Sequence, residues 1–253
     1  MTNTSPSPQN LFEANNIVKR IGTVVIADGV DIHVPAGSIV GMIGPNGAGK
    51  TTMLGIFSGN VKANSGTVVF KGRDVTSVAM AKRARLGIGR TFQIPRPFDK
   101  LTVFEHTLLA VQQSQSVSMS EAHERAIFAL ERCGLLKLIN EIGGDLRLLD
   151  RKRLEMARAV ALDPALVLLD EVAGGLNNAE VGQLIEIVLS LRDSGISFLW
   201  VEHVIRALNA TADRIVCLSG GHLIAEGSPA EVLAHPAVIE SYFGSPAFMS
   251  TAS

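Results

Sequence analysis

Hydrophobic positions near the start of the chain alternate with polar positions at a period of two. Residues 15–43 carry runs of β-branched and apolar residues, separated by turn residues at Gly22, at Gly29 and at positions 35–37. This pattern predicts several β-strands, because alternate side chains of a strand point to opposite faces of its sheet. The last of these strands ends in a glycine-rich turn.

The pattern changes at Lys50 to that of a short helix, which we expect to end at Gly59. Residues 65–72 then predict another strand, with a glycine near each end. A strand, a glycine-rich loop and a helix in this order are typical of phosphate-binding sites.

Strand patterns stop between about residues 100 and 160, where apolar residues recur at i, i+3 and i+4 and predict helices. The expected helices lie at residues 102–113, 121–136 and 151–162. Beyond residue 160, strands alternate with two helices, near 178–193 and 203–210. The four expected strands are 165–170, 196–203, 214–220 and 222–227. This alternation predicts an α/β fold with a parallel-cored sheet, interrupted by a helical insert.

The composition is that of a folded, enzyme-sized unit. Of the 253 residues, 47% are hydrophobic, which is enough for a substantial core. The formal net charge is −1, so there is no global positive field, and we expect no nucleic-acid partner. Residues 1–10 are polar and rich in proline and serine, and we expect a flexible tail rather than a secretory signal. Cys133 and Cys217 lie among apolar residues and are expected to be reduced thiols in the core.

A glycine-rich motif at residues 44–51 fits G-x-x-x-x-G-K-[ST] between a predicted strand and a predicted helix. Glycines let backbone N–H groups curl around a phosphate, and a helix N-terminus adds positive potential. The ammonium of Lys50 would neutralise phosphate oxygens, and the hydroxyl of Thr51 would bind Mg²⁺. The predicted ATP-binding residues are Gly44, Pro45, Asn46, Gly47, Ala48, Gly49, Lys50, Thr51 and Thr52.

Two acids, Asp170 and Glu171, follow the apolar strand 166–169. At the end of a buried strand, Asp170 can hold Mg²⁺ through water, and Glu171 can orient or deprotonate an attacking water. An ordinary acidic turn after a strand would have a similar sequence. The catalytic interpretation therefore depends on the glycine-rich loop that accompanies the acids.

The order of motifs resembles that of ABC transporter ATPases along nearly the whole chain. After the glycine-rich loop come RTFQ, which ends at Gln93, the helical insert, RLEMARA leading into LVLLDE, GGLN, and VEH, which ends at His203. The segments RTFQIPRPFDKLTVFEH, EVAGGLNNAE and EGSPAEVLAHPAVIESYFG are similar to the branched-chain amino acid transporter ATPases, the hydrophobic amino acid uptake family.

This resemblance implies the P-loop NTPase fold of ABC ATPases, with a RecA-like parallel-cored sheet, an N-terminal antiparallel β portion and an inserted helical subdomain. Residues 11–93 and 159–253 would form the nucleotide-binding core. Residues 94–158 would form the helical subdomain that carries the signature segment.

The resemblance also assigns roles to loop residues. Gln93 would sense Mg²⁺ and the γ-phosphate, where the coupling helix of a membrane subunit docks, and His203 would be the switch histidine near the γ-phosphate. A turn glutamine and a structural histidine are the plain alternatives. The D-loop, which touches the opposite subunit, would include Gly174, Gly175, Leu176 and Asn177. The remaining histidines lack such a context and are expected at the surface: His33, His106, His123, His222 and His235.

The signature segment departs from the usual L-S-G-G-Q. The aligned residues are Leu146, Arg147, Leu148, Leu149 and Asp150. Arg147 replaces the serine, and Leu149 replaces a glycine that permits close approach to the nucleotide of the opposite subunit. Either Arg147 contacts that nucleotide as a cation at a helix N-terminus, or one of two composite sites is weakened. We favour the second, because a leucine side chain would obstruct the approach.

The residue expected to stack on adenine also departs from the family pattern. Many ABC ATPases place an aromatic residue there, whereas the aligned residue is Ile21, and the nearest aromatic residue is Phe12. Stacking of a base on an aromatic ring is worth roughly 1–3 kcal/mol. We therefore expect modest nucleotide affinity.

The resemblance therefore implies an ATPase that uses ATP and Mg²⁺ to power an ABC importer, with branched-chain or related amino acids as the expected solutes. The implied partners are membrane permease subunits, a second, non-identical ATPase subunit and, indirectly, a periplasmic solute-binding protein. Since no apolar run is long enough to span a bilayer, we expect a peripheral subunit at the cytoplasmic face of the inner membrane. Three alternatives remain: a soluble, non-transport ABC ATPase, a weakly active or idle partner subunit in an asymmetric heterodimer, and a kinase or GTPase, which the lack of an N-K-x-D segment disfavours.

Overall fold

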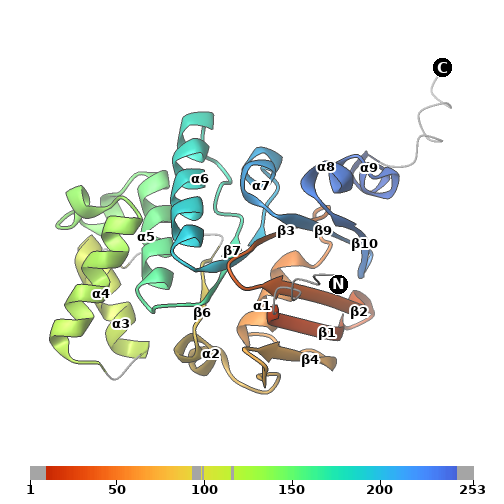
Figure 1. Cartoon of the computed structure of the whole chain (residues 1–253), viewed down its shortest axis with the longest axis horizontal. Coiled ribbons are helices and arrows are strands. Elements are labelled where there is room, and N and C mark those ends of the chain that lie inside the picture. The colour runs from red at the N-terminus through yellow and green to blue at the C-terminus, as the bar shows by residue number, and fades with distance from the viewer. Residues whose placement is uncertain (1–9, 93–97, 99, 115–116, 244–253) are drawn as a thin grey trace, which may run out of the picture.

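Two β-sheets and a group of helices make up residues 10–92, 98, 100–114 and 117–243, the part of the chain that the computed structural model describes (Figure 1). The smaller sheet is antiparallel, in the order β2-β1-β4-β5. Its strands are β1 (Asn10–Ile21), β2 (Val24–Pro35), β4 (Ser65–Phe70) and β5 (Arg73–Asp74). β1 begins at Asn10, the last residue of the expected tail, because Asn10 pairs with Pro35 of β2.

The larger sheet has the strand order β10-β9-β3-β8-β7-β6, and neighbouring strands are parallel except for β10. Every residue of β3, β7 and β8 is buried, as expected for parallel strands that are covered on both faces. The strands are β3 (Ile39–Ile43), β6 (Ile88–Arg90), β7 (Leu166–Asp170), β8 (Ser197–Val201), β9 (Arg214–Ser219) and β10 (His222–Gly227).

The helices of the insert, α3 to α5, lie together at one end of the molecule (Figure 1). The α-helices are α1 (Lys50–Ser58), α2 (Met80–Leu86), α3 (Val103–Ser114), α4 (Met119–Arg132), α5 (Leu148–Val160), α6 (Asn178–Asp193), α7 (Ile205–Thr211), α8 (Pro229–Leu233) and α9 (Pro236–Phe243). Two short 3-10 helices, Leu136–Leu138 and Gly143–Asp145, connect α4 to α5. Within the described residues, no helix combines the length and apolar character needed to cross a bilayer.

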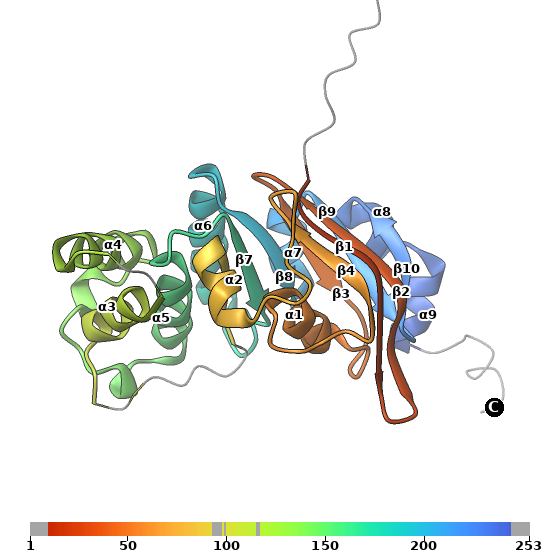
Figure 2. The ribbon, with the colours of Figure 1, turned by 90° about the horizontal axis from the view of Figure 1, so that it is seen from below.

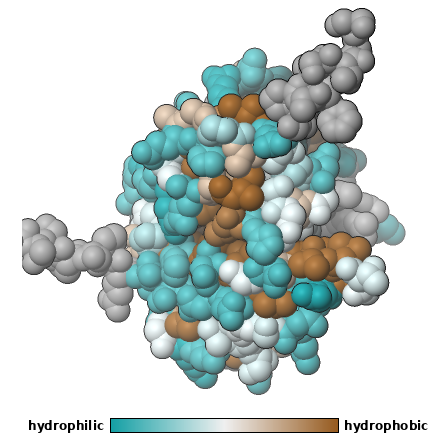
Figure 3. Space-filling model, turned by 90° about the vertical axis from the view of Figure 1, so that its right-hand side faces the viewer, coloured by the Kyte–Doolittle hydropathy of each residue, from teal (hydrophilic) through white to brown (hydrophobic). Residues whose placement is uncertain are grey.

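Strand β3 divides the hydrophobic core into two layers. Ile39 and Ile43 belong to the apolar cluster that extends over α6 and α7 to the insert, whereas Val40 and Met42 belong to the cluster formed with α1 and the antiparallel sheet. α1 is thus covered by both sheets, which Figure 2 shows from below. The face on the right-hand side of Figure 1 is mostly hydrophilic, with separate hydrophobic patches (Figure 3). Scattered patches of this kind are normal on a folded protein.

The predicted fold class is confirmed: a parallel-cored sheet, an antiparallel N-terminal portion and helices between residues 100 and 160 are all present. Local patterns did not predict α2, β5, β6, α8 or α9, since strands of two or three residues and helices of one or two turns carry too few periods. α5 continues to Val160, two residues past the expected end of the insert.

Two expectations about individual side chains have opposite outcomes. Cys133 and Cys217 are buried, free thiols, as predicted, and burial raises their pKa values to about 12 and about 11. The surface position expected for His106 is wrong. Its side chain is buried, with Nε2 3.1 Å from the backbone oxygen of Phe98 and its ring stacked on the Phe98 ring.

Candidate functional site

The carboxyl ends of three neighbouring strands converge at one edge of the parallel sheet. In the strand register, Met42 of β3 lies opposite Val201 of β8, and Val201 lies opposite Asp170 of β7. The segments that follow these strands therefore emerge side by side, which is where open α/β sheets bind ligands. The predicted glycine-rich loop, Asp170–Glu171 and His203 all belong to these segments.

The glycine-rich loop requires glycine for steric reasons at two positions. A Cβ atom at Gly44 would lie 2.1 Å from the backbone oxygen of Leu218. At Gly49, where φ is +95°, a Cβ atom would lie 2.6 Å from Cγ2 of Ile26. The loop is thus packed closely between β9 and β2, and it leads directly into α1.

Lys50 is buried at the N-terminus of α1 and folds back over the loop. Its Nζ donates hydrogen bonds to the backbone oxygens of Gly44 (2.7 Å) and Pro45 (3.1 Å). Burial lowers the pKa of Lys50, and the nearby Glu171 is the strongest of the groups that oppose this effect. The ammonium is therefore held beside the N–H groups that would surround a phosphate.

Thr51 and Asp170 present the oxygen atoms expected for Mg²⁺. Thr51 Oγ1 lies 3.3 Å from Asp170 Oδ1, and the guanidinium of Arg90 lies 3.3 Å from Oδ2. Burial raises the pKa of Asp170, an effect that the charge of Arg90 opposes. Mg²⁺ in proteins commonly binds one or two protein oxygens, together with water and substrate phosphates. Thr51 Oγ1 and Asp170 Oδ1 suit this type of coordination. Within the described residues there is no cluster of three or more His, Cys, Asp or Glu that would suit a metal bound by protein alone.

Glu171 adopts a left-handed backbone conformation, with φ of 49°, that is uncommon for a residue other than glycine. Its backbone N–H donates to the oxygen of Val201 (2.9 Å). Its backbone oxygen accepts from the N–H of Gly174 and from Nζ of Lys152, both at 3.3 Å. These contacts fix the backbone that carries the candidate catalytic carboxylate.

His203 lies beside this carboxylate, with Nδ1 3.8 Å from Oε2 of Glu171. Its side chain is 55% exposed, so its outer face is open to a ligand. A Cβ atom at Gly174 would lie 3.1 Å from Cε1 of His203. The segment predicted as the D-loop therefore begins in contact with the predicted switch histidine.

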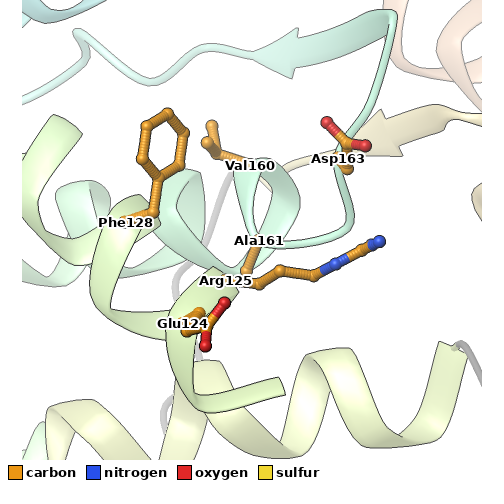
Figure 4. Close-up of a pocket in the computed structure, with 6 residues that line it drawn as sticks. All are labelled: Glu124, Arg125, Phe128, Val160, Ala161 and Asp163. Carbon is orange, nitrogen blue, oxygen red and sulfur yellow. The ribbon is translucent and has the colours of Figure 1, made fainter. Parts of the chain in front are cut away.

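Two cavities of about 290 Å³ occur among the described residues, so volume does not distinguish them. One lies in the helical insert, where side chains of α4 face the C-terminal end of α5 (Figure 4), and is lined by Glu124, Arg125, Phe128, Val160, Ala161 and Asp163. The other joins loop N–H groups, an ammonium, hydroxyl groups and a carboxylate. It is lined by Ile26, Asn46, Gly47, Gly49, Lys50, Thr51, Thr52 and Glu171. Only the second has the chemistry of a nucleotide phosphate site.

The residues that line this cavity include no aromatic ring for a base. Phe12 is fully buried and packs edge-on against Phe57, so it cannot stack on adenine. Ile21 is 56% exposed and pairs with Val24 at the β1–β2 turn. Ile26, which sequence reasoning missed, is the apolar side chain that lines the cavity.

The signature segment begins α5, with exposed Arg147 at its N-cap. The obstruction expected from Leu149 is wrong, because that side chain is 7% exposed and packs inside the chain. Leu148 is the leucine at the surface, 45% exposed, and its Cδ2 would lie 3.2 Å from a Cβ at Gly175. Leu146 is also buried, and Asp150 pairs with Arg153 at 3.1 Å.

Three predicted site residues remain: Asn177, Leu176 and Gln93. Asn177 is the N-cap of α6 and forms a capping box with Glu180, so it has a clear local structural role. Leu176, just before it, is half-buried. Gln93 lies outside the described residues.

Four side chains near the site were not singled out from the sequence: Arg90, Lys152, Glu202 and Tyr242. Each is polar and lies within or beside a quoted motif: Arg90 in RTFQ, Lys152 just before RLEMARA, Glu202 in VEH and Tyr242 in the C-terminal segment. A place in or beside a motif was therefore the one sequence feature that could have identified these four side chains. Their contacts join residues far apart in sequence, such as Tyr242 and Gly44, which no local pattern predicts.

Comparison with known proteins agrees with this geometry. Residues 27–174 match the family model described as "ABC transporter", and residues 222–247 match the one described as "Branched-chain amino acid ATP-binding cassette transporter". The chain is 34% identical over 251 residues to the high-affinity branched-chain amino acid transport ATP-binding protein LivG of Escherichia coli (strain K12), which covers 93% of this chain and 98% of LivG.

Two further relatives extend the comparison. The lipopolysaccharide export system ATP-binding protein LptB of the same strain is 34% identical over 231 residues, which covers 91% of this chain and 96% of LptB. The crystal structure of the ADP conformation of MJ1267, an ATP-binding cassette of an ABC transporter, matches with a TM-score of 0.86 and 31% identity. That match covers 94% of this chain and 100% of MJ1267.

Proposed function

Because this chain belongs to the ABC transporter family of ATP-binding cassettes, which are ATPases, we propose that it powers an importer of branched-chain amino acids or related solutes. One observation carries the ATPase half of the proposal. Lys50, the Thr51–Asp170 pair, Glu171 and His203 converge at the edge of one sheet. The import half rests on the match of residues 222–247 and on the similarity to LivG over most of the chain.

In this mechanism the loop N–H groups and Lys50 bind the phosphates of ATP. Mg²⁺, held by Thr51 and Asp170 when bound, supplies charge neutralisation of phosphate oxygens. Glu171 orients the attacking water and accepts its proton, and its carboxylate lines the same cavity as Lys50. His203, open to solvent beside Glu171, contacts the γ-phosphate end of the nucleotide.

The proposed assembly is a dimer in which α5 of each subunit faces the nucleotide of the other, with Gly175, Leu176 and Asn177 at the interface. The second ATPase subunit would be non-identical, because Arg147 and Leu148 make the signature of this chain unusual. Permease subunits would dock around Gln93. The complex would place this chain at the cytoplasmic face of the inner membrane and receive its solute from a periplasmic binding protein.

A second candidate, an exporter ATPase, follows from the equal identity to LptB, whose name assigns that protein to lipopolysaccharide export. The match of residues 222–247 favours amino acid import over this alternative. The two candidates share the ATP site and differ only in the membrane partner.

Reconstitution tests the proposal. The chain is purified, its ATP hydrolysis is measured alone and then with candidate permease and partner ATPase subunits in vesicles, and uptake of radiolabelled leucine is followed. We expect stimulation on assembly, ATP-dependent uptake, and loss of both in Glu171→Gln. Robust hydrolysis unaffected by membrane subunits would contradict a transport role. Hydrolysis unaffected by Glu171→Gln would contradict the assigned chemistry.

A further inference from the structure

A buried carboxylate, Glu202, joins two loops of the site, although it does not line the nucleotide cavity. Its side chain is fully buried. Oε1 accepts hydrogen bonds from the backbone N–H of Ala173 (2.6 Å) and from the indole N–H of Trp200 (3.3 Å). Oε2 accepts from the backbone N–H groups of His203 and Val204, both at 3.1 Å. One carboxylate therefore ties the loop after β7 to the loop after β8.

All four hydrogen bonds of this carboxylate come from N–H donors. This pattern suits an ionised carboxylate, which has about four lone-pair sites and only accepts. Burial raises the pKa of Glu202, and the N–H donor of Ala173 is the strongest of the contacts that oppose this effect. An amide in its place could accept from one pair of donors but would turn its own NH₂ group towards the other pair.

A buried lysine from the signature helix reaches the same place. Lys152 of α5 is 4% exposed, and its Nζ donates to the backbone oxygen of Glu171. Burial lowers the pKa of Lys152, and the charge of Glu202 is the larger of the two that oppose this effect, ahead of Glu171. The lysine thus gives α5 a buried hydrogen bond to the loop that carries the catalytic carboxylate.

The loop needs such support because of its conformation. Glu171 has a positive φ, which persists only where surrounding contacts determine it. Three residues later, Gly174 packs against the ring of His203 so closely that a Cβ atom would lie 3.1 Å from it. The two loops therefore pack closely against each other, and two buried charged side chains, Glu202 and Lys152, donate or accept hydrogen bonds at their backbone.

We propose that Glu202 and Lys152 are positioning residues for ATP hydrolysis: Glu202 holds the Glu171 loop against the His203 loop, and Lys152 connects both to α5. A displacement of the signature helix would then shift the catalytic carboxylate within the same subunit. This inference rests on the ATPase function proposed above and assigns two residues that line no part of the nucleotide cavity.

The test compares Glu202→Gln with wild type in the complete chain. Hydrogen exchange should be faster in the variant in at least one of the peptides covering residues 171–177 and 202–206, because the amide turns its NH₂ group towards one of the two pairs of donors. Turnover per bound nucleotide, measured alone and in the assembled complex, should fall roughly 10- to 100-fold, the effect of losing one or two charge-assisted hydrogen bonds at a reacting group. The Kd for a fluorescent ATP analogue should stay within about threefold.

Lys152 is tested by two substitutions. Lys152→Met should lower turnover with little change in Kd, whereas Lys152→Arg, which keeps a cationic donor, should retain most of the activity. The matched control is Glu155→Gln, on the same helix. Glu155 is also a buried carboxylate, but it pairs with Arg158 at 2.6 Å and touches neither loop, so turnover and loop exchange should match wild type.

Turnover of Glu202→Gln within twofold of wild type, with unchanged exchange in both loops, would overturn the inference while leaving the ATPase function intact. Equal losses in Kd, turnover and thermal stability would also overturn it, because they indicate general structural damage. A wild-type chain that neither hydrolyses ATP nor responds to Glu171→Gln would instead refute the proposed function. In that case the exchange measurement still decides whether Glu202 holds the loops.

Discussion

The hydroxyl group of Tyr242 accepts a hydrogen bond of 2.8 Å from the backbone N–H of Gly44. The two residues are 198 positions apart, and the contact joins α9 to the first residue of the phosphate-binding loop. Gly44 is buried, and a buried backbone N–H needs an acceptor, which the Tyr242 hydroxyl supplies. The C-terminal segment is thereby part of the structure that shapes the nucleotide site.

We expect Tyr242→Phe to weaken ATP binding about three- to tenfold, as the loss of a single hydrogen bond is worth roughly 0.5–1.5 kcal/mol. Titration with a fluorescent nucleotide measures the change. Ile239→Ala, an exposed position on the same helix, is the control and should leave Kd unchanged. Equal Kd values for Tyr242→Phe and wild type would show that the contact has no influence on the loop.

Arg83 of α2 is a buried cation that caps the C-terminal end of α1. Its guanidinium donates to the backbone oxygens of Ile56, Phe57, Thr76 and Val78 at 2.8–2.9 Å. Burial lowers its pKa to about 10.

Arg83→Met would remove a buried, charged donor from each of these four carbonyl groups, so we expect the free energy of unfolding to fall by about 3 kcal/mol or more. Urea denaturation measures this loss. Arg85→Met, at an exposed position two residues along α2, should change stability by less than about 0.5 kcal/mol. A loss below about 1 kcal/mol for Arg83→Met would mean that water replaces the guanidinium.

The strands and the acids at their ends were predictable from the sequence because their signals are local. The run 166–170 and the motif 44–51 each specify their own conformation, and the parallel sheet then brings them together. Side-chain direction within α5 was not predictable in this way. A shift of one residue rotates the direction by about 100°, and this separates exposed Leu148 from buried Leu149.

The contacts of Glu202, Lys152 and Tyr242 were unpredictable for a different reason. Each joins segments that are adjacent only after the sheet has formed, as when Lys152 reaches Glu171 across 19 positions. The identity of a residue in a single sequence does not show whether an acid or a lysine is buried or exposed. Only the packed structure distinguishes them.

Glu155 should make stability depend on pH. Burial raises its pKa above the ordinary 4.5, an effect that Arg158 opposes but does not cancel. The folded state therefore binds the proton more tightly than the unfolded state, so the stabilisation is present at low pH and is lost as pH rises through the folded pKa.

Glu155→Gln removes this titration. We expect the stability of wild type relative to Glu155→Gln to decrease as pH rises above the ordinary glutamate pKa of 4.5, measured by urea unfolding at each pH. The comparison cancels the titration of other groups. A stability difference that is constant, or that grows in favour of wild type, would mean that the ion pair with Arg158 dominates over burial.

The signature segment offers a test of asymmetric hydrolysis. Arg147 and Leu148 are exposed at the start of α5, so Arg147→Ser with Leu148→Gly restores the usual serine and first glycine at little cost to packing, about 1 kcal/mol for the glycine. If these side chains limit the partner's site, hydrolysis by the assembled complex should rise severalfold, while this chain's own Kd for ATP stays constant.

Leu149→Gly is the contrasting variant, because deletion of a buried leucine side chain should cost about 2–5 kcal/mol without any gain in activity. Unchanged or reduced hydrolysis in the double variant, with the complex still assembled, would indicate that Arg147 contacts the opposite nucleotide productively and that the altered signature is functional.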